Sequence, residues 1–311
     1  MSSKNKIVVF AYSDVGHACL KFLVENKHPV AHVYTHADKS GEKIWFPSVK
    51  ELAAAHKIPF TLDADLKSAS EQKKLTDLKP DLVLSFYYRN MIPKYILDLP
   101  KLGAYNMHGS LLPKFRGRAP VNWAVLKGES QTGATLHVMV EKPDAGDMID
   151  QEAVPIGPDD SAMAVQVRVT QAAVKVLSRQ IVPLLEGKAL CKPQNNSLST
   201  YFSGRKPEDG RIDWSKPAGE IHNLIRAVTH PYPGAFTDIF GKKTYIWASR
   251  LPQRKAPQRS PGELISEKNQ LFIVCGQDSL LEVVQIQSDG EPEMAVGEFL
   301  KSSNFTRGKR D

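Results

Sequence analysis

The chain has 311 residues, of which 41% are hydrophobic, so it is longer than one typical domain and can bury a substantial core. Its net charge of +7 is spread along the chain, which favours the binding of anionic small molecules. The sequence lacks the concentrated basic stripe of a protein that binds nucleic acid. No stretch approaches the roughly 20 apolar residues that span a bilayer, and the three cysteines form no Cys-x-x-Cys pair. We therefore expect a cytoplasmic protein with reduced thiols, no membrane insertion and nucleic acid disfavoured as a partner.

The N-terminal part alternates between strand and helix patterns. Residues 6–12 have an apolar strand pattern, residues 16–25 a helical one and residues 29–35 a β-branched run, which together predict a β-α-β opening. Residues 81–88 are a continuous apolar run, typical of a strand in a buried parallel sheet. The fold class that follows is α/β, a Rossmann-like parallel sheet with helices on both faces. The turn at residues 12–16 has one glycine where a dinucleotide fingerprint has three, so we expect no NAD cofactor.

A polar pair stands at the end of the next predicted strand, residues 103–107, which leads into a Gly-Ser turn. Residues two apart on a strand share a face, so Asn106 and His108 should point the same way. An asparagine amide is a neutral hydrogen-bond donor suited to an oxyanion, and histidine moves protons near neutral pH. Asp144 follows a second apolar strand, residues 132–140, and a carboxylate beside an imidazole would orient it and favour its protonated form. The trio suits the tetrahedral intermediate of an acyl transfer.

No nucleophile accompanies this trio, because the chain has no Gly-x-Ser-x-Gly elbow and no suitably placed cysteine. Direct transfer of an acyl group to a substrate amine fits best. Structural interpretations stand beside the catalytic one, since Asn106 could cap a turn and His108 could be a satisfied strand-end histidine. We interpret Asp147 as structural and His137 as a core histidine, because no ligand motif of recognised spacing supports zinc, and we expect no metal.

The second half of the chain predicts a helix, a linker and a β domain. Residues 161–185 have the apolar spacing of a long helix that closes the first domain. Residues 188–205 turn polar, with proline, asparagine and glycine, which is the composition of a linker. The domain boundary is therefore placed near Thr200, with domains at residues 1–200 and 201–311. Short strand patterns with turn glycines in the second domain predict a small OB-like β-barrel.

Three further stretches carry weaker signals. The pair Trp45-Phe46 and the run at residues 225–228 could help bind an amine substrate or form an apolar corner. Residues 299–311 are polar and basic, which predicts a frayed C-terminal tail.

The run from Asn106 to Pro120, with Asp144-Ala145-Gly146-Asp147 after it, resembles the folate-dependent formyltransferases. Their pattern is Asn-x-His-x-Ser-Leu-Leu-Pro-x-x-Arg-Gly followed by Asp-x-Gly-Asp, and the resemblance runs along essentially the whole chain. It implies that Asn106, His108 and Asp144 are catalytic and that N10-formyltetrahydrofolate is the co-substrate. It also implies folate contacts, largely through backbone groups, from Asn90, Met91, Ile92, Arg118, Val140, Glu141, Lys142, Pro143 and Asp144.

Within that family, the sequence around the motifs is most similar to the formyltransferases of UDP-4-amino-4-deoxy-L-arabinose, as in Phe86-Tyr87-Tyr88-Arg89 and Gly41-Glu42-Lys43. This resemblance implies formyl transfer to the 4-amino group of that UDP-sugar, in lipid A modification and polymyxin resistance. Such enzymes often carry a C-terminal dehydrogenase domain that oxidatively decarboxylates UDP-glucuronic acid. The resemblance therefore implies that this domain is separate or missing here.

Three alternatives remain open at this point. Methionyl-tRNA formyltransferase shares the fold, the co-substrate and the trio, but usually has Arg-Gly-Ala-Ala-Pro where this chain has Arg-Gly-Arg-Ala-Pro at residues 116–120. It also has a longer basic loop, offering more phosphate contacts, where this chain has residues 36–43. The second alternative is a formyltransferase for another 4-amino-sugar nucleotide. The third is a catalytically silent sugar-nucleotide or folate binding module, since a fold alone does not fix function.

Overall fold

The computed structural model describes residues 5–38 and 44–302. The chain folds as two compact units, each assembled from three stretches of sequence. The first unit holds Met1–Pro120, Gln131–Val154 and Gln166–Ser203, and the second holds Val121–Ser130, Pro155–Val165 and Gly204–Asp311. The expected short loop at residues 39–43 and the end of the expected tail, residues 303–311, lie outside the described residues.

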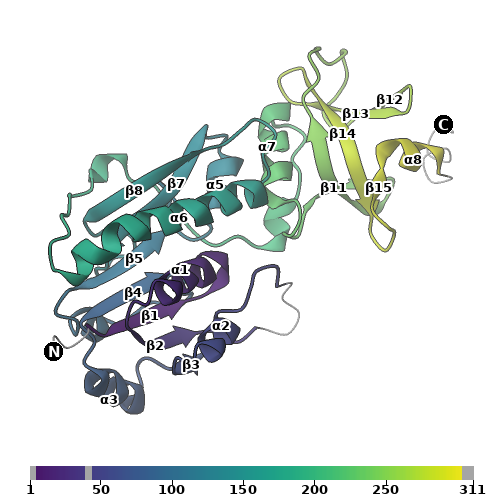
Figure 1. Cartoon of the computed structure of the whole chain (residues 1–311). Helices are drawn as coiled ribbons and strands as arrows, with labels where there is room; N and C mark the ends of the chain where they lie inside the picture. The colour runs from purple at the N-terminus through teal and green to yellow at the C-terminus, as the bar shows by residue number, and fades with distance from the viewer. Residues whose placement is uncertain (1–4, 39–43, 303–311) are drawn as a thin grey trace. The chain divides into compact units, whose positions relative to one another are not determined.

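The first unit is built on a mixed sheet whose described strands run in the order β3-β2-β1-β4-β5-β7-β8 (Figure 1). The first five strands in that order are parallel, and β7 runs antiparallel to β5. Every residue of β1 and β4 is buried, as expected where helices cover both faces. The predicted α/β fold class is confirmed. The strands are β1 (Ile7–Ala11), β2 (Val30–Thr35), β3 (Phe60–Leu62), β4 (Leu82–Phe86), β5 (Ala104–His108), β7 (Gln131–Val138) and β8 (Met148–Pro155).

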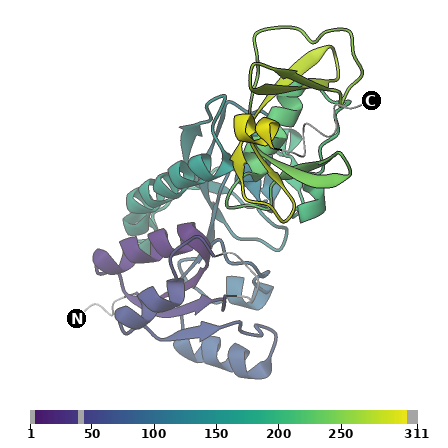
Figure 2. The ribbon, with the colours of Figure 1, turned by 90° about the vertical axis from the view of Figure 1, so that its right-hand side faces the viewer.

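Helices pack on both faces of this sheet (Figures 1 and 2). On one face, Asp14 in the first turn of α1 accepts a hydrogen bond from Gln166 of α6, which ties the two helices together. On the other face, Leu75 of α3 and Ile96 of α4 pack with Phe10 of β1 in one hydrophobic cluster. The helices are α1 (Ser13–Glu25), α2 (Val49–Ala55), α3 (Ala69–Leu78), α4 (Lys94–Leu97) and α6 (Ala162–Leu185).

The second unit contains an antiparallel sheet whose strands pair in the order β10-β11-β14-β13-β12, with β15 beside β14. Ile265, Phe272, Val274 and Leu280 form its buried cluster. The predicted small β domain after an α/β domain is thereby confirmed. Its elements are α5 (Pro120–Leu126), η2 (Pro207–Gly210), α7 (Ala218–Val228), β10 (Ala235–Ile239), β11 (Lys242–Arg250), β12 (Leu264–Glu267), β13 (Gln270–Cys275), β14 (Ser279–Ser288), β15 (Met294–Ala295) and α8 (Val296–Lys301).

The first residues of the expected frayed tail belong to a helix. Phe299 and Leu300 are buried and belong to α8, so the expectation is wrong for the first residues of that segment. Two apolar side chains on one turn of a short helix are too weak a pattern to be recognised from sequence. Among the residues that the structure describes, none of the helices combines the length and the apolar character needed to cross a membrane.

Candidate active site

Asn106 and His108 lie on β5, between the parallel strand β4 and the antiparallel strand β7 (Figure 1). The register places His137 of β7 opposite Asn106 and Thr135 opposite His108. His108 is the last residue of β5, at the carboxyl end of the parallel strands. Open α/β sheets place their ligand sites along this edge.

His108 is buried, and each of its ring nitrogens faces an acceptor. Nε2 lies 2.7 Å from the carbonyl oxygen of Phe115, and Nδ1 lies 3.5 Å from Oδ1 of Asp144. A ring that carries two N–H protons satisfies both acceptors. Asp144 therefore stands where it can orient the imidazole. For His108 to move a proton in a reaction, one ring nitrogen must exchange its protein partner for the substrate.

Asp144 is held as a carboxylate by its surroundings. Burial raises the pKa of this carboxyl, but His108, His137 and the N–H of Gly117 stabilise the charged form more strongly, so the pKa falls well below its ordinary value of 3.8. The N–H of Gly117 donates to Oδ2 of Asp144 at 2.8 Å. The side chain is thus a fixed negative charge beside the imidazole of His108.

His137 also belongs to this cluster, and the sequence did not indicate that it does. Its Nδ1 lies 2.9 Å from the carbonyl oxygen of Val138, and its Nε2 lies 3.2 Å from Nδ2 of Asn106. Nε2 also lies 3.5 Å from Oδ1 of Asp144. The interpretation of His137 as a core histidine is therefore incomplete, because the ring is buried but contacts two residues of the trio. A primary amide has a second N–H, which leaves Asn106 a donor for a reacting oxygen.

The loop that carries Asp144 is fastened by the segment predicted as a linker. Gln194 donates from Nε2 to the carbonyl oxygens of Asp144 (2.8 Å) and Gly146 (2.6 Å), and its Oε1 accepts from Nη2 of Arg116 (2.7 Å). The strand β9 (Tyr201–Phe202) pairs in parallel with β6 (Arg116–Gly117). Residues 188–205 are thus part of the scaffold of the site as well as a connection.

Arg116 and Arg118 lie in different environments. Arg116 is only 3% exposed and also donates to Oδ1 of Asn196, at the start of η1 (Asn196–Leu198), so its charge is buried. Arg118 is exposed, and its backbone N–H donates to the carbonyl oxygen of Phe202 at 2.9 Å. Arg116 therefore has a structural role, and Arg118 is the arginine whose side chain is more accessible.

The two stretches expected to contact folate flank β5. Asn90, Met91 and Ile92 follow β4, and residues 140–144 lie in the loop between β7 and β8. Met91 is 62% exposed and Val140 is 42% exposed, so each stretch presents an apolar side chain to solvent. Behind them, Ile92 and Met139 pack against the hydrophobic cluster of the first unit. The arrangement offers apolar surface and backbone groups on both sides of the trio.

The residues considered for an amine substrate are engaged in packing. Phe46 lies edge-on to Tyr12, with ring centroids 5.2 Å apart, and Trp45 packs against Phe46. In the second unit, the guanidinium of Arg226 is buried and donates to the carbonyl oxygen of Asp160 at 2.9 Å. Arg226 therefore has a structural role in the second unit.

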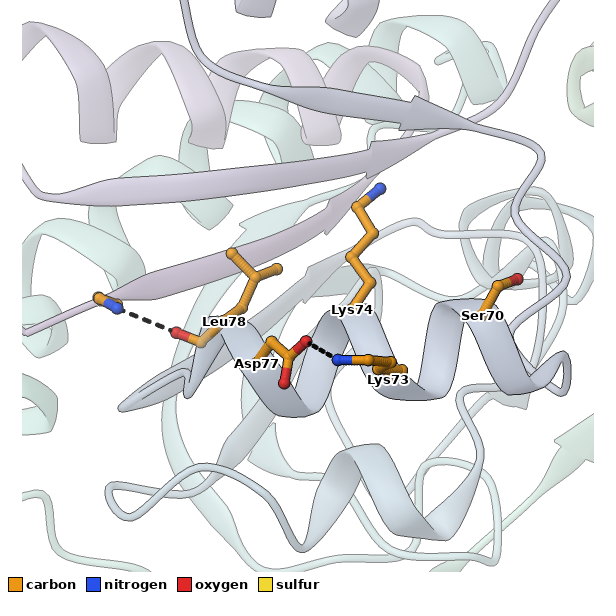
Figure 3. Close-up of a pocket in the computed structure, with 6 residues that line it drawn as sticks. Ser70, Lys73, Lys74, Asp77 and Leu78 are labelled. Atoms are coloured by element: carbon orange, nitrogen blue, oxygen red, sulfur yellow. Dashed lines mark hydrogen bonds and ion pairs between the residues drawn. The ribbon is translucent and has the colours of Figure 1, made fainter.

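A hollow of about 550 Å³ lies against α3 (Figure 3). Lys73 donates to Asp77 at 2.6 Å, and Nζ of Lys6 donates to the carbonyl oxygen of Leu78 at 3.2 Å. The lining contains none of the predicted site residues. The described residues also contain no group of three or more His, Cys, Asp and Glu side chains placed to hold a metal ion.

Solved structures share this fold over nearly the full chain. A sugar 3N-formyl transferase called WlaRD, solved with dTDP and 5-N-formyl-THF, matches with a TM-score of 0.69 and 20% identity, covering 94% of this chain and 100% of its own. An N-formyltransferase from Helicobacter canadensis, in complex with folinic acid and dTDP-3-aminofucose, matches with a TM-score of 0.71 and 20% identity, covering 91% and 99%. A 4-N formyltransferase from Francisella tularensis matches with a TM-score of 0.63 and 24% identity, covering 77% and 95%. These likenesses show the fold.

Family matches cover most of the chain. The family described as "Formyl transferase" matches residues 4–181, and that described as "Formyl transferase, C-terminal domain" matches residues 205–304. The chain therefore belongs to the formyl transferase family, as its motifs predicted.

Proposed function

We propose that this protein transfers a formyl group from N10-formyltetrahydrofolate to the amino group of a nucleotide-linked sugar. The observation that carries this proposal is the placement of Asp144 3.5 Å from Nδ1 of His108, with Asn106 two residues before His108 on β5. This arrangement lies on a fold shared with sugar N-formyltransferases that were solved with folates and dTDP ligands. No covalent nucleophile is needed, because the acceptor amine attacks directly.

In the proposed reaction, the neutral amine of the sugar attacks the formyl carbon, and a new C–N bond forms while negative charge develops on the formyl oxygen. Asn106 donates its second amide N–H to that oxygen, and His108 adds a charged donor. Protonated His108 gives its proton to the folate nitrogen N10 as the bond from N10 to carbon breaks, and it then takes a proton from the amine nitrogen, which restores the charged ring. Asp144 stays ionised throughout and orients His108, so that the proton balance is carried by the imidazole alone.

The surroundings of the trio fit a folate. The pterin and aminobenzoyl rings need apolar surface, which Met91 and Val140 present on the two sides of β5. The polar edges of the pterin need backbone donors and acceptors, which irregular stretches such as residues 90–92 and 140–144 supply. Arg118 supplies positive charge for an anionic group. On this proposal Asn90, Met91, Ile92, Arg118 and residues 140–144 form the folate site, and residues 1–200 form the catalytic domain.

For the acceptor we propose UDP-4-amino-4-deoxy-L-arabinose, which would place the reaction in lipid A modification and polymyxin resistance. The support is the similarity of Phe86-Tyr87-Tyr88-Arg89 and the neighbouring motifs to enzymes that act on this sugar. A 4-N formyltransferase among the structures of the same fold is consistent with a 4-amino acceptor.

The test is turnover with purified protein, N10-formyltetrahydrofolate and separate acceptors, followed as tetrahydrofolate release. We expect turnover with UDP-4-amino-4-deoxy-L-arabinose and none with methionyl-tRNA. His108→Gln should lower kcat by at least about 100-fold, as for loss of general acid–base catalysis, whereas His56→Gln, on the exposed end of α2, should retain it. Formylation of tRNA would show that the acceptor is not the UDP-sugar. Full turnover by the His108 variant would show that His108 is not catalytic.

A further inference from the structure

A second pair, a buried histidine and an exposed carboxylate, lies at the ends of β2 and β3. Nδ1 of His36 lies 3.0 Å from Oδ1 of Asp63, and the other carboxylate oxygen accepts the N–H of Ala37 at 3.1 Å. The imidazole side chain is 5% exposed. A carboxylate on one ring nitrogen fixes the tautomer, so Nδ1 carries the proton and Nε2 of the neutral ring is an acceptor.

That acceptor holds the backbone that follows β4. The N–H of Arg89 donates to Nε2 of His36 at 3.3 Å, and the ring of Tyr88 stacks on the imidazole with centroids 4.3 Å apart. The preceding residue, Tyr87, has a φ of 57°, a left-handed conformation that costs a non-glycine residue about 1–3 kcal/mol. The chain therefore leaves β4 through a strained residue, and His36 is one of the groups that keep it there.

We propose that neutral His36, oriented by Asp63, is a positioning residue for the stretch Asn90 to Ile92. This inference rests on the proposed function, in which that stretch binds the folate. Protonation of Nε2 would turn the acceptor into a donor that faces the donor N–H of Arg89. Acid therefore releases the backbone after β4 and weakens folate binding, independently of the trio on β5.

Aromatic and charged side chains surround the imidazole of His36. Among the described residues, the titratable and charged groups that the contacts place against it are Asp63 after β3, Tyr88 and Arg89 after β4, and Tyr12 after β1. The hydroxyl of Tyr12 in turn donates to Asp38 at 3.2 Å. Burial, with a further contribution from Asp63, raises the pKa of Tyr88 to about 12, so that ring stays neutral. Among these groups, only the imidazole has an ordinary pKa between about pH 5 and 8.

The test is the affinity for 5-formyltetrahydrofolate by calorimetry from about pH 7.5 to about pH 5.5. The wild type should lose about tenfold in affinity over this range. His36→Gln supplies an amide oxygen for Arg89 and an amide N–H for Asp63 at every pH, so its affinity should stay within about threefold of wild type at pH 7.5 and remain flat. His36→Leu should bind about tenfold more weakly at both ends of the range.

The matched control is His32→Gln, a buried histidine on the same strand that contacts Thr61 and not the backbone after β4. It should keep the wild-type pH dependence. A wild-type affinity that does not change with pH, or a His36→Gln variant that keeps the dependence, would overturn the inference.

A ligand-free readout separates this inference from the proposed function. Amide hydrogen exchange of the peptide covering residues 86–93 should be slow in wild type and His36→Gln, and faster in His36→Leu. If this pattern holds but no variant binds the folate, the role of His36 in holding the backbone stands and the folate proposal fails. If folate binds and exchange is the same in all three proteins, the inference about His36 is wrong.

Discussion

Asp144 has a left-handed backbone conformation, with φ of 53°, and its carboxylate is largely buried, so its position depends on partners from several segments. The N–H of Gly117 binds its carboxylate and Gln194 binds its carbonyl oxygen. A buried carboxylate without such partners would become protonated. These contacts explain how a loop residue keeps the negative charge that orients His108.

Asp144→Asn is expected to lower kcat at least about 100-fold, because the imidazole loses its orienting charge. It should also lower the free energy of unfolding by about 1–3 kcal/mol at pH 5. The pKa of Asp144 is depressed in the folded protein, so its stabilisation is complete above its ordinary value of 3.8 and is lost as the pH falls towards the folded value. The difference in the free energy of unfolding between wild type and variant, measured by urea unfolding, should therefore become smaller from about pH 5 to about pH 3.

The control for this prediction is Asp147→Asn. Asp147 lies close to Asp144 in the chain, but it contacts β7 through its backbone carbonyl oxygen, which accepts the N–H of Val138. It should behave as wild type in both assays. If the difference in the free energy of unfolding between wild type and Asp144→Asn were the same at both pH values, the carboxylate would not be the stabilising group.

At the scale of elements, local sequence patterns predicted individual helices and strands well, but they did not predict which strands and loops contact one another. The predicted helix at residues 161–185 matches α6, and the predicted strands at residues 6–12 and 81–88 contain β1 and β4, because each stretch has an apolar pattern of its own. The role of His137 depends on the register between β5 and β7, which no local pattern encodes. The polar residues of the segment 188–205 bind backbone groups of another loop, and such contacts leave no hydrophobic period in the sequence.

The pairing of β6 with β9 is expected to be sensitive to Gly117. This glycine has a φ of 98°, and a Cβ there would overlap the backbone carbonyl of Phe202. Gly117→Ala should therefore lower the free energy of unfolding by about 2 kcal/mol or more and reduce kcat at least about tenfold, since its N–H is aligned with Asp144. Urea unfolding and initial rates check both effects.

Gly219→Ala is the matched control, because no atom lies within 4 Å of a Cβ at that position in α7. It should be neutral or stabilising by up to about 1 kcal/mol. A Gly117 variant that retains wild-type kcat and stability would mean that the pairing of β6 with β9 does not position the carboxylate.

At the scale of the whole molecule, the second unit is not one continuous piece of chain. It takes Val121–Ser130 and Pro155–Val165 from the middle of the sequence. Arg226 on α7 shows why, since its buried guanidinium donates to the carbonyl oxygens of Gly157, Asp160 and Val125. Sequence composition placed one boundary near Thr200, and it could not show these earlier segments because the contacts are made by backbone oxygens.

A fragment of residues 204–311 is therefore expected to fold poorly, because Arg226 would lose these three acceptors and leave a buried charge. Thermal unfolding followed by circular dichroism should lack a cooperative transition or show a much lower midpoint than the full chain. The same fragment with Arg226→Leu should recover part of the transition. A fragment that melts cooperatively at the temperature of the full protein would contradict this division of the chain.

The most direct measurement is a competition assay in one vessel, with N10-formyltetrahydrofolate and equal concentrations of UDP-4-amino-4-deoxy-L-arabinose, a dTDP-linked amino sugar and methionyl-tRNA, and with all formylated products quantified by mass spectrometry. We expect the formyl group on the 4-amino group of the UDP-sugar, and we expect His108→Gln to remove this product. Formyl groups found on the tRNA, or product formation unaffected by loss of His108, would contradict it.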